Sequence, residues 1–125
     1  MSPVRHDVLD ASQVEDLRGI DDGAMLARLV GMYLSRTPER IKSLRTHVEA
    51  KNFKEIAREA HTLKGASGSI GAARVAEVCR KIEQAGTTQA AKPLEELVPA
   101  LETEFGLARD ALQAMANGGK PGATR

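Results

Sequence analysis

Aromatic residues are scarce in this chain of 125 residues, which has one Tyr, two Phe and no Trp. Proteins that bind single-stranded nucleic acid stack bases on several aromatic side chains, and most sheet cores favour aromatic and β-branched residues. An excess of one charge is absent too, because 18 Lys and Arg balance 17 Asp and Glu to a net charge of +1. Since binding to nucleic-acid phosphates usually needs a strongly basic face, the composition argues against a nucleic-acid partner and against a sheet-based fold.

Cysteine and long apolar runs are also scarce. The single cysteine, Cys79, excludes an internal disulfide and a zinc site built from cysteines. The N-terminus lacks the basic-then-apolar pattern of a secretory signal. The most apolar stretch, residues 24–34, is interrupted by Arg28 and is too short to cross a bilayer. We therefore expect a cytoplasmic protein of one domain's length that does not associate with membranes.

What the chain does have is helix-forming residues in an amphipathic pattern. Ala, Leu, Glu, Lys and Arg are abundant, and apolar residues recur every three or four positions, which is the spacing of one helix face. In chain order, the predicted helices cover residues 12–18, 25–50, 53–70, 75–86 and 93–115. No strand pair is evident.

Capping residues and prolines suggest where these helices begin. Ser12, three residues before Glu15, has the spacing of a capping box. The aspartates at 21–22 can cap the second helix. Pro38 is typical of a first helical turn, so residues 25–50 can form either one kinked helix or two.

The helices predict an all-α fold, which we expect to be an antiparallel up-down four-helix bundle with an extra short N-terminal helix, over residues 11–116. Gly86 is expected to end the fourth helix, and Pro99 to kink the last helix or delay its start. Residues 1–10 are predicted to be a flexible N-terminus. Residues 117–125 are predicted to be a disordered tail, because they are rich in Gly, Lys and Pro.

One stretch, residues 60–71 (AHTLKGASGSIG), places a histidine in unusual surroundings. On a helical wheel, His61 points roughly 130° away from the centre of the apolar stripe, and therefore away from the core. Gly65 and Gly68 follow one and two turns later on the same side, and Ala57 precedes His61 by one turn. Because each glycine inside a helix costs about 1 kcal/mol relative to alanine, this bare backbone predicts a face that another protein approaches closely.

The same stretch suits the transfer of a phosphoryl group through the imidazole. A neutral imidazole nitrogen is a good nucleophile near neutral pH, since its unperturbed pKa is about 6.5. Lys64 can place a positive charge beside a phosphoryl group, which adds nearly two negative charges. Positioning and charge stabilisation supply most of the catalysis of phosphoryl transfer. Arg58 can belong to a basic rim around His61, although it is equally well explained as a solvated surface residue.

The run His-Thr-Leu-Lys-Gly that begins at His61, with Gly71 ten residues after the histidine, resembles the motif of the histidine phosphotransfer (HPt) domain family of two-component phosphorelays. The resemblance extends over most of the chain, from about residue 10 to 115. It implies that His61 is the phosphoaccepting histidine, that Lys64 lies on the phosphate side and that Gly65 provides clearance for the partner.

The resemblance also suggests a role for Glu83, because some family members have a glutamate 22 residues after the histidine, near the ring. On this interpretation the carboxylate of Glu83 accepts a hydrogen bond from one ring nitrogen and leaves the other nitrogen free to attack. An ordinary surface carboxylate is an equally good interpretation.

The partners that the resemblance implies are receiver domains of response regulators and a sensor or hybrid histidine kinase. The Mg²⁺ of the reaction would belong to the receiver, and this chain would need no cofactor. No ATP-binding kinase segment is evident, so we expect a monomeric phosphoryl carrier and not an enzyme.

Two other functions stay open. The bundle could dock receivers as an adaptor without carrying phosphate, or it could be the phosphoacceptor segment of a chemotaxis-type kinase. His61 and Lys64 argue against the adaptor, and a chain that begins with Met1 and ends in a polar tail favours a complete small protein. A metal hydrolase bundle is remote, because no Glu-x-x-His pair is present.

Overall fold

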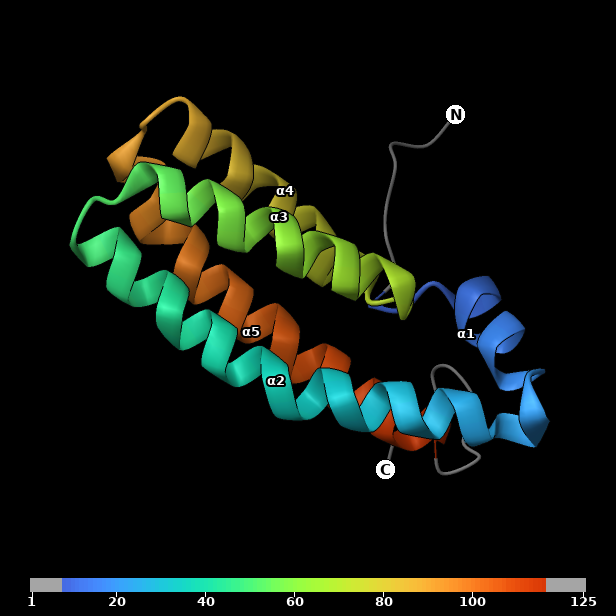
Figure 1. The fold of residues 1–125 in the computed structure, drawn as a ribbon. Helices are drawn as coiled ribbons and strands as arrows, with labels where there is room; N and C mark the ends of the chain where they lie inside the picture. Colours follow the sequence, from blue (N-terminus) through green and yellow to red (C-terminus); the bar gives the residue numbers. More distant parts are fainter. Residues whose placement is uncertain (1–7, 117–125) are drawn as a thin grey trace, which may run out of the picture.

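The computed structural model describes residues 8–116, and its regular elements in that range are all helical (Figure 1). They are α1 (Ala11–Arg18), the 3₁₀ turn η1 (Asp21–Gly23), α2 (Ala24–Glu49), α3 (Phe53–Ser69), α4 (Ala73–Thr87) and α5 (Ala91–Ala116). The predicted all-α class is therefore confirmed. The predicted tail over 117–125 and the first seven residues of the predicted flexible N-terminus lie outside the described residues. Between residues 8 and 116, no helix is both long enough and apolar enough to cross a membrane.

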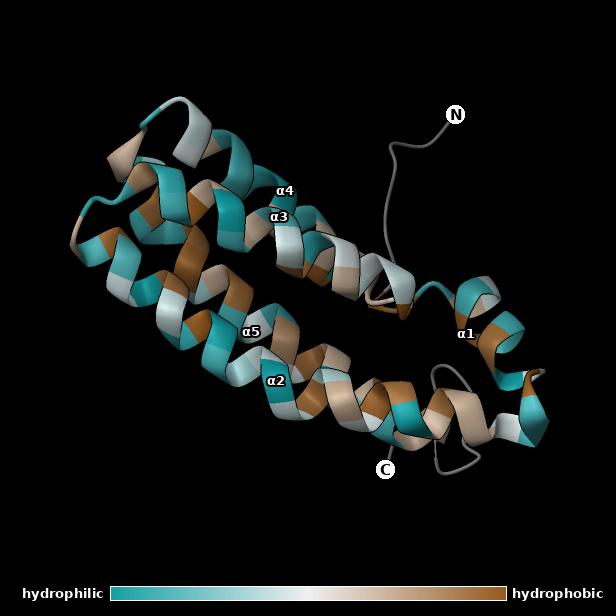
Figure 2. Ribbon diagram, in the orientation of Figure 1, coloured by the Kyte–Doolittle hydropathy of each residue, from teal (hydrophilic) through white to brown (hydrophobic). Residues whose placement is uncertain are grey.

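The four long helices lie alongside one another, and α1 lies past the ends of α3 and α4, where it packs against α2 (Figure 1). The contact between α3 and α4 is the most extensive, and α5 packs against both α4 and α2. Hydrophobic residues lie mainly where the helices face one another (Figure 2). The largest fully buried side chains include Leu26, Leu44, Ile56, Leu63, Ile82, Leu94, Leu101 and Leu112. This aliphatic core agrees with the low aromatic content, and its aromatic pair is Tyr33 and Phe105, whose rings meet edge to face.

The segment before α1 is held against the turn that follows α3. Leu9 is buried, and the backbone N–H of Asp10 donates a hydrogen bond to the carbonyl oxygen of Gly71. Gly71 has a φ of 82°, which favours glycine, and a Cβ there would lie 3.2 Å from the Asp10 carbonyl oxygen. The Asp10 side chain caps α1 by accepting from Gln13 N–H. The predicted capping role of Ser12 is therefore wrong, because the tertiary contact at Asp10 starts the helix earlier.

The predicted helix over residues 25–50 is a single helix, α2, with Pro38 inside it. Neither aspartate at 21–22 caps α2, so that prediction is wrong. The chain instead turns through left-handed conformations at Asp22 and Gly23, and no side chain caps the first turn. Pro99 likewise lies inside α5 and does not delay its start. Both prolines are exposed, and packing of the flanking turns against the core keeps each helix continuous.

Gly86 is the last residue but one of α4, so the helix runs one residue past its predicted end, to Thr87. At this point α4 approaches α3 so closely that a Cβ on Gly86 would lie 3.0 Å from the backbone nitrogen of Ala57 and 3.2 Å from the carbonyl oxygen of Phe53. Glycine is therefore needed for the contact between the helices and not for a turn. Since Ala57 is one turn before His61, the contact also sets the separation of α3 and α4 at the candidate site.

Gly86→Ala is expected to destabilise the protein by about 1–3 kcal/mol, because the added methyl group meets backbone that no rotamer change can move. Gly68→Ala is the matched control. A Cβ on Gly68 meets nothing within 4 Å, so the higher helix propensity of alanine should stabilise the protein by up to about 1 kcal/mol. Urea unfolding of both variants measures the two shifts, and a stabilised Gly86→Ala protein would contradict the close approach.

Candidate functional site

The outward face of α3 carries His61, whose side chain is 68% exposed. The opposite face of this helix supplies four fully buried residues: Ile56, Ala60, Leu63 and Ser67. Ser67 is satisfied there by a hydrogen bond of 2.7 Å to the hydroxyl of Tyr33. The orientation of His61 predicted from the apolar stripe is therefore confirmed.

Two of the residues predicted to meet a partner form a bare stretch of backbone after His61. Gly65 and Gly68 are both exposed, and a Cβ built on either meets nothing within 4 Å. Ala57 is half-buried beside α4, so it contributes less open surface than expected. Arg58 is exposed and lies 3.9 Å from Glu55 on its own helix. The accessible part of the predicted face therefore includes Arg58 and continues past His61 to Gly65 and Gly68.

Glu83 of α4 brings the charged residues of the site together. One carboxylate oxygen, Oε2, lies 3.0 Å from Nδ1 of His61, and the other, Oε1, lies 2.8 Å from Nζ of Lys64. The contact between Glu83 and the ring, which the sequence left open, is present in the structure. Glu83 is thus shared between His61 and Lys64, so the ammonium group of Lys64 and the imidazole meet the same carboxylate.

The protonation of this cluster follows from its hydrogen bonds. The hydrogen bond from Lys64 lowers the pKa of Glu83, with a smaller contribution from His61, and these effects outweigh the partial burial that would raise it. Glu83 is therefore ionised at neutral pH and can only accept hydrogen bonds. A neutral His61 must then carry its proton on Nδ1, which leaves the lone pair on Nε2. The arrangement presents an exposed nucleophilic nitrogen with its tautomer fixed.

Other reactive groups of the described chain do not join this site. Cys79 is fully buried in the core, and burial raises the pKa of its thiol to about 12. Between residues 8 and 116, no group of three or more His, Cys, Asp or Glu side chains is placed to hold a metal ion. His61 is thus the exposed nucleophile around which this face is organised.

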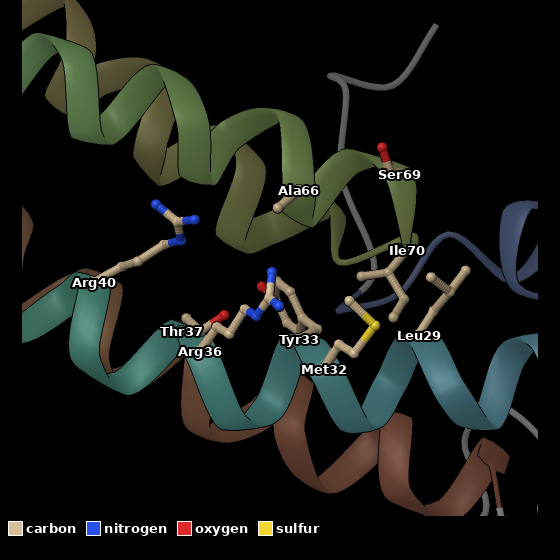
Figure 3. A pocket seen from close by; sticks show the side chains of 9 residues that line it. All are labelled: Leu29, Met32, Tyr33, Arg36, Thr37, Arg40, Ala66, Ser69 and Ile70. Carbon is tan, nitrogen blue, oxygen red and sulfur yellow. The ribbon is translucent and has the colours of Figure 1, made fainter.

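A pocket lies beside this face, between α2 and α3 (Figure 3), and no pattern in the sequence pointed to it. The pocket depends on which faces of the two helices meet, so helix periodicity alone does not reveal it. One available signal is Met32, a large apolar residue that is 41% exposed on α2.

Comparisons with known proteins agree with this geometry. The chain resembles the solved histidine-containing phosphotransfer protein B of Pseudomonas aeruginosa, with a TM-score of 0.84, 21% identity and coverage of 91% of this chain and 98% of the other. It also resembles a histidine-containing phosphotransfer protein of Medicago truncatula, with a TM-score of 0.75, 24% identity and coverage of 94% and 85%. These likenesses establish a shared fold. A search of curated protein sequences finds no significant match.

The family assignment comes from the sequence itself. The model of the Hpt domain family matches residues 28–118, which is well over half of the chain and includes all of α3 and α4. The motif around His61 that resembles this family therefore lies inside the matched segment. We conclude that this chain belongs to the Hpt domain family, the phosphotransfer domains of two-component phosphorelays.

Proposed function

We propose that this chain carries a phosphoryl group on Nε2 of His61, between receiver-domain aspartates or from a histidine kinase to a response regulator. The observation that carries the proposal is the hydrogen bond between Glu83 and Nδ1, which leaves Nε2 free on an exposed face. The chain acts as a carrier and not as a kinase, and the receiver supplies the Mg²⁺. We infer that it works as a cytoplasmic monomer, with α2 to α5 as an antiparallel up-down bundle and α1 as the extra helix.

The proposed transfer is a single displacement at phosphorus. The lone pair of Nε2 attacks the phosphorus of an aspartyl phosphate on the partner. The N–P bond forms while the bond between phosphorus and the aspartate oxygen breaks, and the electron pair leaves with the aspartate carboxylate. The proton on Nδ1 stays in place, so the ring becomes positively charged and Glu83 stabilises it. The reverse step returns the phosphoryl group to the next aspartate.

Lys64 has two possible partners during this cycle. Before transfer it pairs with Glu83 at 2.8 Å, and its side chain is 35% exposed. Phosphorylation adds nearly two negative charges nearby, and the flexible lysine side chain can turn its ammonium group towards them. We infer that Lys64 stabilises the incoming phosphoryl group, while Glu83 positions the ring.

Lys64→Ala is expected to slow transfer without abolishing it, because the nucleophile remains. The loss of a charge-assisted contact is worth about 1–3 kcal/mol, which is roughly one to two orders of magnitude in rate. Rapid-quench measurement of phosphoryl transfer checks this. Lys81→Ala is the control, since Lys81 is an exposed lysine on α4 outside the cluster. Equal rates for both variants in both directions would remove Lys64 from the proposed mechanism.

The proposed function is tested by incubating the chain with phosphorylated receiver domains from its source organism. We expect phosphate that is labile in acid and stable in alkali to move onto this chain within seconds. Stable binding of receivers without any phosphate uptake would instead favour the adaptor function.

A further inference from the structure

Helices α3 and α4 meet through a glycine that lies about one turn from the candidate site. Gly86 is buried, and a Cβ built on it would lie 3.0 Å from the backbone nitrogen of Ala57 and 3.2 Å from the carbonyl oxygen of Phe53. Both atoms belong to the backbone of α3, so a change of rotamer cannot move them away. A Cβ meets no backbone atom of another helix at the other glycines inside the described helices, Gly31, Gly65, Gly68 and Gly106.

This contact lies close to the charged cluster of the site on both helices. Glu83 precedes Gly86 by three residues on α4, which is about 4.5 Å along the helix and about 60° around it. His61 follows Ala57 by four residues on α3, which is about 6 Å along that helix and about 40° around it. Since packed helices transmit small shifts over such a distance, the spacing of α3 and α4 at Gly86 also fixes their spacing at Glu83.

The carboxylate of Glu83 leaves little freedom in this spacing. Oε2 lies 3.0 Å from Nδ1 of His61, and Oε1 lies 2.8 Å from Nζ of Lys64. Because both oxygens are engaged, the side chain cannot follow one partner without turning away from the other. A carbon atom packs at about 3.5 Å or more from its neighbours, so a methyl group on Gly86 would push the helices apart by about 0.5 Å. The distance to Nδ1 would then approach about 3.5 Å, beyond the usual length of an N–H···O hydrogen bond.

We propose that Gly86 is a positioning residue for phosphoryl transfer, because it lets α4 lie close enough to α3 for Glu83 to reach His61 and Lys64 together. This inference rests on the proposed function and adds what keeps the site assembled. If α4 moves outwards, Nδ1 loses its acceptor and the ring proton can occupy Nε2 instead. A proton there removes the lone pair that attacks phosphorus. Gly86 itself is buried and acts only through Glu83.

Two substitutions test this role in different ways. Gly86→Ala moves α4 and leaves Glu83 unchanged, whereas Glu83→Asp leaves the helices in place and shortens the carboxylate side chain by one methylene group. The second adds no atom to the contact between the helices, so it tests the required reach even if Gly86→Ala does not fold. Both variants are expected to release the ring proton from Nδ1.

Leu26→Ala is the control for a loss of stability without a change at the site. Leu26 is fully buried near the start of α2, about 35 Å along that helix from the end that leads into α3. Its truncation leaves a cavity and is expected to destabilise the protein at least as much as Gly86→Ala. The ring of His61 should nevertheless keep its wild-type protonation in this variant.

The first measurement is the ¹⁵N NMR spectrum of the neutral His61 ring, which requires no phosphate donor. The wild-type chain and Leu26→Ala should carry the proton on Nδ1, and both site variants should shift it towards Nε2. The second measurement is the rate at which phosphoramidate, a small phosphodonor, phosphorylates His61. Gly86→Ala should lower this rate about threefold to tenfold, which is the scale of one lost hydrogen bond.

A double-mutant cycle shows whether Gly86 acts through Glu83. In a chain that already carries Glu83→Gln, the further change Gly86→Ala should alter the phosphoramidate rate less than about twofold, because the contact that it disturbs is already gone. The same loss of rate with and without Glu83 would contradict the proposed route.

Two further outcomes would overturn the inference and leave the phosphoryl carrier intact. Retention of the proton on Nδ1 in folded Gly86→Ala or in Glu83→Asp would show that the site tolerates a change in reach. Equal slowing by Leu26→Ala would assign the effect to stability. If the wild-type chain instead took up no phosphate from phosphoramidate or from any receiver, the proposed function would be overturned, and the role of Gly86 in transfer with it, whatever the NMR spectrum showed.

Discussion

Gly65→Gln is expected to reduce phosphoryl exchange with a receiver domain by about 10²-fold or more while leaving the protein folded. A Cβ at this position meets nothing within 4 Å, so we expect the isolated chain to gain helix propensity worth about 0.5 kcal/mol. The same side chain stands one turn from His61, where the partner must bring its aspartate to bonding distance. A displacement of about 1 Å at the reacting atoms can cost about 10²-fold in rate.

Two controls separate clearance from other effects of this substitution. Gly31→Gln makes the same change in helix α2, also where a Cβ meets nothing within 4 Å, and should leave exchange unchanged. Phosphoramidate needs no approach of a protein surface, so it should phosphorylate Gly65→Gln almost as well as the wild-type chain. A Gly65→Gln protein that exchanges phosphate with its receiver at the wild-type rate would show that the glycine is incidental.

His61→Gln is expected to abolish phosphate acceptance and to change stability by no more than about 0.5 kcal/mol, because an exposed side chain is replaced on a helix surface. Glutamine keeps a polar group near Glu83 but supplies no nucleophilic nitrogen. His47→Gln is the control, since His47 is a half-buried histidine on α2 outside the site, and it should accept phosphate normally. Phosphate uptake by a folded His61→Gln protein would overturn the mechanism.

The helices could be predicted from sequence better than their ends could. Apolar spacing of three and four residues is a local property, and it predicted the all-α fold and the buried face of α3. The start of α1 depends instead on the hydrogen bond between Asp10 and Gly71, across about sixty residues of sequence. The role of Gly86 could not be predicted from local sequence either, because it depends on the backbone of Ala57 in another helix.

The features of the candidate site also differ in how well the sequence predicts them, according to whether they depend on one helix or on two. The exposure of His61 and the bare backbone at Gly65 follow from positions on one helix, so the helical wheel predicted both. The sharing of Glu83 between His61 and Lys64 depends on how α4 lies against α3, and only the family resemblance pointed to that glutamate. The pocket beside the site was missed because it is formed by side chains of two helices.

The most direct test of the account is nitrogen-resolved NMR of the chain labelled with ¹⁵N at histidine, before and after phosphorylation by a receiver domain. We predict that phosphorus couples to Nε2 of His61 and to neither of the other two histidines in the sequence. Before phosphorylation, the ring should carry its proton on Nδ1, where Glu83 accepts the hydrogen bond. Phosphorus on Nδ1 of His61, on another histidine or on no histidine would contradict the account.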